Sequence, residues 1–281
     1  MRNLMSAAWL RVRKNKVFWG AMILMAFFAV NSRLDQYVQR KRFGVEATLE
    51  TSFFDFIMFA SILMSVFISL FLGTEYGEGT IRNKIVVGHK RSEIYGSNLL
   101  ICMMVNLLLV AAYLLPSLAL GIPLVGSFRS GFGAILILFG CSILLLSAYT
   151  ALYTAVAMVC QSRAVTAVIC VLGVFLLLIA GIFIHGRLEA PEYYSPYSIS
   201  VADDGGIVMD ERQNEEPNPE CLQGTKRKVY EFFLDFLPGG QTIQITSMSA
   251  PHLGMMALYS VLIVSGSTGI GLYAFYKKNI K

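Results

Sequence analysis

The chain has 281 residues and a formal net charge of +5; 56% of its residues are hydrophobic and only 15% are charged. Its mean hydropathy of +0.61 is too high for an ordinary soluble domain, and its long apolar runs are apolar all round rather than amphipathic. This composition excludes a soluble globular protein and predicts an all-α polytopic membrane protein.

Six apolar runs are long enough to cross the bilayer, so the sequence predicts one transmembrane domain over residues 1–281. Before the first run lies a basic helix with one apolar face, made by Leu4, Met5, Ala8, Trp9 and Val12. Such a pattern is typical of a helix lying in the membrane interface. In chain order we expect an interfacial helix (1–16), a first span (17–33), a second span (53–73), a polar loop (74–95), a third span (96–120), a fourth span (132–159), a fifth span (164–184), a long acidic loop (185–253) and a sixth span (254–276).

Polar side chains within or beside the spans carry further expectations. Lys16 and Arg33 should snorkel to water from the ends of the first span, and residues 31–52 should form a loop. Asp55, near the outer end of the second span, either reaches water or lines a substrate path. Asn106 lies near the middle of the third span, where it either bonds to a neighbouring helix or lines the same path.

The distribution of charge predicts the orientation in the membrane. The side that holds both termini and the 74–95 loop carries 13 lysines and arginines against 10 on the other side, and the outermost spans both have basic flanks. The loop 185–253 contains 11 acidic and 5 basic residues. We therefore expect both termini in the cytoplasm and the long acidic loop outside.

The loop 74–95 is the only sizeable polar stretch in the first half of the chain. Thr80 is a plausible N-cap for a short helix that Gly88 would end by adopting positive φ. Ile81 and Ile85 lie one turn apart on one side of this helix, and Arg82, Asn83 and Lys84 surround the other. Such a helix suits docking into a partner's groove; the alternative is a connector that only returns the chain to the membrane.

Several short motifs in this loop share one pattern. They are Glu75, Gly79-Thr80-Ile81-Arg82, Gly88, Arg91 and Ile94-Tyr95. The pattern resembles the loop after the second span in membrane subunits of type 2 ABC (ATP-binding-cassette) exporters, although many of these proteins carry proline and serine where this chain has Gly88, His89 and Lys90. The run Leu237-Pro238-Gly239-Gly240-Gln241 and the six-span layout extend the resemblance over essentially the whole chain.

The resemblance implies that the 74–95 loop forms a coupling helix that fits into a cytoplasmic ABC ATPase. The residues implied for this interface are Glu75, Glu78, Thr80, Ile81, Arg82, Lys84, Ile85, Gly88 and Arg91. Glu75 is expected to pair with a basic residue such as Arg91 across the loop.

The same resemblance implies a complex in the plasma membrane of a bacterium. Two copies of the ATPase would bind ATP and Mg²⁺, and a second permease copy or a homologous permease would complete the transport path. The cargo would be a peptide, an antibiotic, a lipid or another amphipathic molecule.

The chain itself lacks the sequence signatures of catalysis. It has no GxxxxGK[ST] phosphate loop, so ATP must be bound by another subunit, and we expect no cofactor or metal and no enzymatic activity in this chain. Its five cysteines have no metal-binding spacing, its three histidines are scattered among loops, and its basic residues do not form a nucleic-acid-binding face. The alternative function is a membrane-embedded sensor or enzyme whose acidic outer loop binds a ligand.

Overall fold

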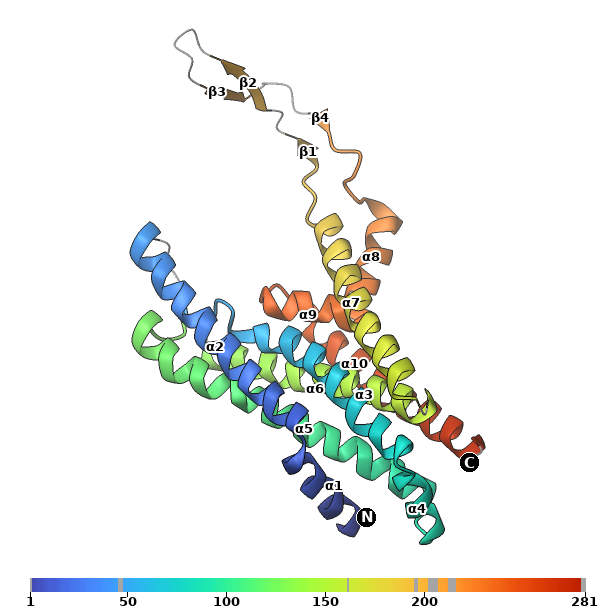
Figure 1. The fold of residues 1–281 in the computed structure, drawn as a ribbon. Helices are drawn as coiled ribbons and strands as arrows, with labels where there is room; N and C mark the ends of the chain where they lie inside the picture. The colour runs from blue at the N-terminus through green and yellow to red at the C-terminus, as the bar shows by residue number, and fades with distance from the viewer. Residues whose placement is uncertain are drawn as a thin grey trace.

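The computed structural model describes residues 2–44, 48–160, 162–194, 197–201, 207–211 and 216–278. Within these ranges, six helical segments are long and apolar enough to cross a membrane, which confirms the predicted all-α, multi-pass class (Figure 1). These segments are α2 (Lys16–Phe43), a 3-10 turn (Phe53–Asp55) continued by α3 (Phe56–Gly77), α5 (Arg91–Val125), α6 (Phe132–Cys160), α7 (Arg163–Leu188) and α10 (Leu253–Lys277).

Shorter elements occupy the two ends of this bundle. One end holds α1 (Arg2–Lys14), α4 (Thr80–Val86) and both termini, whereas the connection between α7 and α10 extends from the other end (Figure 1). That connection contains α8 (Gly224–Phe236), α9 (Pro238–Thr246) and four short strands, β1 (Tyr193–Tyr194), β2 (Tyr197–Val201), β3 (Ile207–Glu211) and β4 (Glu216–Pro217). The strands pair antiparallel, β1 with β4 and β2 with β3.

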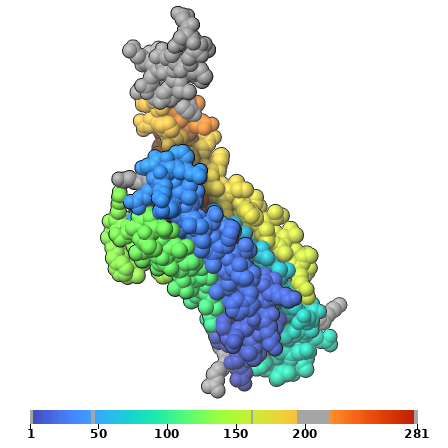
Figure 2. Space-filling view, turned by 60° about the vertical axis from the view of Figure 1, so that its left-hand side comes forward, coloured from blue at the N-terminus to red at the C-terminus, as the bar shows by residue number. Residues whose placement is uncertain are grey.

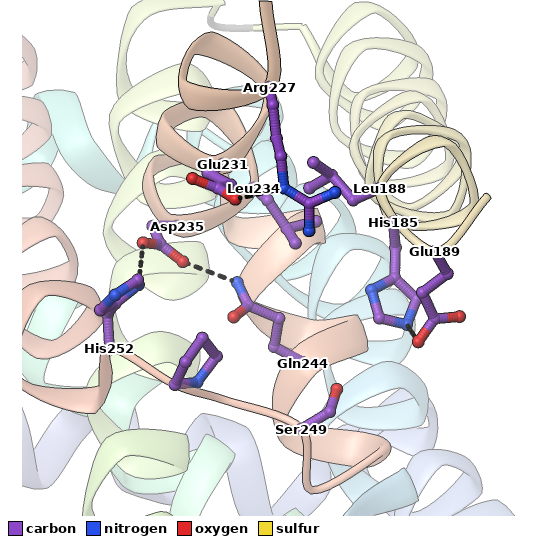
Figure 3. Close-up of a pocket in the computed structure, with 11 residues that line it drawn as sticks. His185, Leu188, Glu189, Arg227, Glu231, Leu234, Asp235, Gln244, Ser249 and His252 are labelled. Carbon is purple, nitrogen blue, oxygen red and sulfur yellow. Dashed lines mark hydrogen bonds and ion pairs between the residues drawn. The ribbon is translucent and has the colours of Figure 1, made fainter. Parts of the chain in front are cut away.

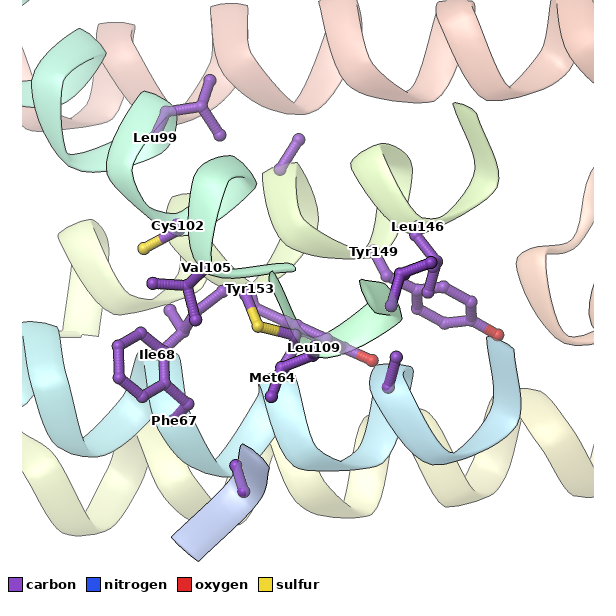
Figure 4. Close-up of a cluster of buried hydrophobic side chains, with 14 of the residues drawn as sticks. Met64, Phe67, Ile68, Leu99, Cys102, Val105, Leu109, Leu146, Tyr149 and Tyr153 are labelled. Carbon is purple, nitrogen blue, oxygen red and sulfur yellow. The ribbon is translucent and has the colours of Figure 1, made fainter. Parts of the chain in front are cut away.

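Helix α3 is the centre of the bundle. In the most apolar 18-residue stretch of the α3 span, 67% of the residues are buried within the protein. The corresponding share is 22% for α7 and 11% for α10. Ser61, Ser65, Ser69 and Gly73 recur every fourth residue along α3, and such small residues let membrane helices approach closely. The core is built where α3 meets α5 and α6, with Phe67, Val105 and Tyr149 among its buried side chains (Figure 4). The outer faces of α7 and α10 are left for lipid or for another protein.

Helix α2 differs from the predicted first span because it continues to Phe43 and takes in much of the expected loop 31–52. Arg33 does not snorkel to water: its side chain is fully buried. Its guanidinium donates hydrogen bonds to the Ser117 hydroxyl (3.0 Å), to the Gln36 amide oxygen (2.8 Å) and to the Thr51 carbonyl (2.9 Å). These acceptors replace water, so the helix has no reason to end there.

The loops at the strand-bearing end are fastened by Glu50. Its carboxylate accepts hydrogen bonds from the backbone N–H of Arg129 (2.6 Å) and of Ser130. Burial raises the pKa of Glu50, but hydrogen bonds from Ser130 and from the Thr48 hydroxyl together lower it by more than burial raises it. The pKa of Glu50 therefore lies below its ordinary value. The loop before α3 is thereby joined to the loop before α6.

The region before the last span contains a helix that the sequence did not predict. Helix α8 ends at Phe236, and Pro238 then occupies the first turn of α9 instead of ending helical structure. A Cβ atom built on Gly239 would overlap the backbone carbonyl of Leu177 in α7, and one on Gly240 would overlap the carbonyl of Leu234. The two glycines are therefore required for close packing of α9 against its neighbours.

Candidate functional site

The candidate coupling site is organised around Glu75, in the last turn of α3. Its side chain is fully buried and accepts hydrogen bonds from Arg11, from Lys84 (2.9 and 3.0 Å to the two carboxylate oxygens) and from the Asn98 amide (3.2 Å). We call Glu75, Arg11, Lys84 and Asn98 the Glu75 network. A buried carboxylate needs such partners, because burying an unpaired charge is costly.

The Glu75 network joins the consecutive helices α3, α4 and α5 to α1, which α2 separates from them in the sequence. Arg11 comes from α1, Lys84 from α4 and Asn98 from α5. Leu4, Ala8 and Val12 are buried and fix α1 against the bundle, while the Arg11 guanidinium also lies 5.1 Å from the centre of the Phe71 ring. Figure 2 shows the N-terminal segment and the α4 region together at one end of the elongated molecule. Helix α4 is thus connected to α1, α3 and α5 through a single carboxylate.

Glu75 pairs with basic residues as predicted, namely Arg11 and Lys84, but Arg91 is not one of them. It donates hydrogen bonds to the backbone carbonyls of Phe275 (2.7 Å), Tyr276 (2.8 Å) and Lys278 (2.8 Å) at the end of α10. Carbonyls in the last turn of a helix have no partner within the helix, and a cation there also interacts favourably with the helix dipole. Arg91 therefore anchors α10 to the start of α5.

The apolar side of α4 faces the bundle rather than a partner. Ile81 is 1% exposed and belongs to the chain's own core, and Ile85 is half-buried, whereas Val86 is 79% exposed and Val87 is 77% exposed. A helix of seven residues can be held in place only by tertiary packing, and its apolar side provides that packing here. The expected docking pair Ile81 and Ile85 is therefore turned toward the bundle, and the exposed apolar side chains at the end of this helix are Val86 and Val87.

The remaining predicted residues of α4 have mixed outcomes. Gly79, not Thr80, precedes the helix with a φ of +67°, and Thr80 is the first helical residue. Gly88 adopts the expected positive φ, at +96°. Arg82 and Glu78 are exposed, whereas the Lys84 side chain is only 13% exposed because it faces Glu75.

The two residues predicted near a substrate path lie in different surroundings. Asn106 donates hydrogen bonds to the Leu146 carbonyl (3.0 Å) and to the Thr150 hydroxyl (3.0 Å), both on α6, which confirms the helix-bonding interpretation. Asp55 is half-buried at the start of α3, where it interacts electrostatically with Arg33. The sequence missed this buried arginine because its position resembles that of a snorkelling residue.

A pocket of about 200 Å³ opens at the other end of the bundle, between α7, α8, α9 and the segment before α10 (Figure 3). We call it the outer pocket. His252 lies 3.2 Å from the Asp235 carboxylate, which also accepts a hydrogen bond from Gln244 (3.0 Å), and His185 lies 3.2 Å from Glu189. His185 is part of α7 and shares this pocket with His252, so the prediction that the histidines are scattered loop residues is wrong for this pair.

Comparison with known proteins adds no further identification: no family model matches the chain, and no curated protein matches it. Within the described ranges, no group of three or more His, Cys, Asp or Glu residues could hold a metal ion. The site is therefore interpreted from its own geometry.

Proposed function

We propose that the chain is the membrane subunit of a type 2 ABC exporter, in which α4 docks onto a separate cytoplasmic ATPase. The observation that carries the proposal is the exposed apolar end of α4, Val86 and Val87, on a helix held to the bundle by the Glu75 network. Val86 ends the helix and Val87 is its C-cap, so the two valines form a small exposed apolar surface that suits contact with a partner. The loop motifs and the six candidate spans support the same assignment.

The proposed mechanism is a linkage between ATP binding and the arrangement of the spans. Two ATPase copies bind ATP and Mg²⁺, close against each other and move the α4 helices of two permease copies. Because Lys84 and Arg11 share the Glu75 carboxylate, movement of α4 shifts the balance between inward-open and outward-open states. The cargo is an amphipathic molecule such as a peptide, an antibiotic or a lipid.

Replacing Val86 and Val87 with aspartate should weaken ATPase binding by at least about 100-fold, because each buried valine contributes about 1.5 to 3 kcal/mol and a carboxylate is costly to bury. The chain is co-expressed with the ABC ATPase of the neighbouring reading frame, and the ATPase recovered with it in mild detergent is measured. Asn83→Asp, which places the same charge on an exposed polar position of α4, is the matched control and should bind normally. Equal ATPase recovery by both variants would show that α4 is only a connector.

The proposed orientation can be tested with a membrane-impermeant maleimide on intact cells. Cys221, in the connection between α7 and α10, should be labelled, whereas a cysteine introduced at the exposed Arg82 should be labelled only after permeabilisation. The Cys221→Ser variant measures the background labelling of the other four cysteines, all of which lie within helices. Labelling of Arg82→Cys in intact cells would show that the orientation of the chain in the membrane is the opposite of the one proposed.

The outer pocket supports a second candidate function, a membrane-embedded sensor that binds a ligand between α7, α8 and α9. A sensor of this kind requires no ATPase. Failure of any ABC ATPase to co-purify with the chain would therefore favour the sensor over the exporter.

A further inference from the structure

A second pocket, of about 220 Å³, lies where α1, α2 and α3 meet. We call it the inner basic pocket. Its lining consists of Arg11, Lys14, Asn15, Phe71, Thr74 and Glu78. It is adjacent to the Glu75 network, with which it shares Arg11.

Three of the lining residues are suited to donate hydrogen bonds to an anion. The hydrogen bond from Arg11 to Glu75 uses one nitrogen of a guanidinium that has five N–H donors. Asn15 caps α2 by accepting from the backbone N–H of Val17 (2.8 Å) and of Phe18 (3.4 Å), which leaves its amide NH₂ group as the donor on the pocket side. Lys14 is exposed and adds a mobile ammonium group.

The pocket has an apolar side and a polar side, as expected at the boundary of a bilayer. Phe71 is buried in the bundle, and Glu78 is exposed just beyond the end of α3. Trp19, in the second turn of α2, is 52% exposed and its indole N–H donates to the Arg13 carbonyl at 2.8 Å. Tryptophan with this combination of exposed ring and anchored N–H is typical of the interface between lipid tails and headgroups. The inner basic pocket therefore lies at headgroup depth.

We propose that the inner basic pocket binds the phosphate group of an anionic glycerophospholipid through Arg11, Lys14 and Asn15. Basic pockets between membrane helices on the cytoplasmic side bind such headgroups through charge-assisted hydrogen bonds. The lipid chains would extend along the exposed apolar face of α2, which includes Ile23 and Phe27. The assignment is independent of the cargo and of any ATPase, because it uses only residues of this chain and a component of the membrane.

Lipid binding also has a consequence for the Glu75 network. Arg11 would contact the lipid phosphate on one side and Glu75 on the other, with its guanidinium held against Phe71. An occupied pocket fixes this arginine in the position in which it pairs with Glu75. Glu78 also lines the pocket, and its negative charge, opposite to that of Arg11 and Lys14, repels an anion and so limits how tightly the anion binds.

The test uses the purified full-length chain in a neutral detergent, which has no charged surface of its own. Phosphatidylglycerol and phosphatidylcholine with the same acyl chains are titrated and the bound lipid is counted by native mass spectrometry. Lys14→Gln should weaken phosphatidylglycerol binding about fivefold or more, the effect of removing one charged donor. Arg13→Gln removes the same charge from the neighbouring exposed residue outside the pocket and should leave binding within about twofold. Glu78→Gln should strengthen it.

Two results would overturn the proposal. One is equal loss of phosphatidylglycerol by Lys14→Gln and Arg13→Gln, which would indicate a diffuse attraction to the whole basic helix. The other is binding of inorganic phosphate or glycerol 3-phosphate as tight as that of the lipid, measured by competition, which would make a soluble anion the ligand. Tighter binding of phosphatidylglycerol than of phosphatidylcholine, lost selectively in Lys14→Gln, supports the lipid site.

Discussion

Replacing Glu75 with alanine should lower the free energy of unfolding by about 3 kcal/mol, the lower end of the range for breaking a buried ion pair. The lower end applies because Arg11, with a side chain 31% exposed, can still reach water after the change, whereas Lys84, 13% exposed, cannot do so without moving α4. The measurement is denaturant or thermal unfolding of the detergent-solubilised chain. Glu78→Ala, at an exposed carboxylate one turn further on, should change stability by less than about 0.5 kcal/mol.

A double substitution separates the ion pair from simple loss of packing. If Lys84 is left as an unpaired cation in Glu75→Ala, then adding Lys84→Met should recover part of the lost stability, so that the two changes are non-additive by about 1 kcal/mol or more. Strictly additive effects would mean that the unpaired Lys84 contributes nothing to the stability lost in Glu75→Ala. The link from α3 to α4 would then not depend on the ion pair of Glu75 and Lys84. In the exporter that we propose, the same variants should reduce ATP-driven export more than membrane insertion.

Replacing Gly239 with alanine should destabilise the chain by about 3 kcal/mol or more, at the upper end of the range for overpacking. The added methyl group would overlap the main-chain carbonyl of Leu177, and a main-chain atom in a helix cannot rotate away as a side chain can. Unfolding is measured as for Glu75, and size-exclusion chromatography reports loss of the folded species.

Gly254→Ala is the matched control for Gly239→Ala. Gly254 lies in the first turn of α10, and a Cβ there meets no atom within 4 Å. The change should therefore be neutral, or should stabilise the chain by about 0.4 to 1 kcal/mol because alanine lowers the conformational entropy of the unfolded state. If Gly239→Ala were as stable as Gly254→Ala, then α9 would not be packed against α7 as described.

The parts of the fold that could be predicted are those that the bilayer imposes. A helix must be apolar over a fixed length to cross hydrocarbon, and this requirement is local in sequence, so the six spans could be located without knowledge of their neighbours. The end of α2 could not be predicted, because Arg33 donates hydrogen bonds to Ser117 in α5 and to Thr51, and these contacts exist only after the helices have assembled.

The candidate site was predictable in place but not in detail. The polar loop and its resemblance marked residues 74–95, and Glu75 is indeed central there, yet its partner Arg11 lies 64 positions earlier in the chain. Helical periodicity placed Ile81 and Ile85 on one face correctly but could not determine whether that face meets the bundle or a partner. The same limitation hid α9, since Gly239 and Gly240 signal the end of a helix unless the close approach of α7 is known.

The anchor that Arg91 forms with α10 has a consequence for how the chain tolerates change. All three acceptors are main-chain carbonyl oxygens, so the bonds survive whatever side chains stand at the positions that supply them. Sequence drift at Tyr276 and Lys278 is therefore unconstrained by this contact, while Arg91 itself must be kept. For protein engineering, the exposed Tyr276 is the position near the end of α10 to exchange, because Phe275 is buried under the Arg91 guanidinium and the Lys278 ammonium donates a hydrogen bond to the Val159 carbonyl.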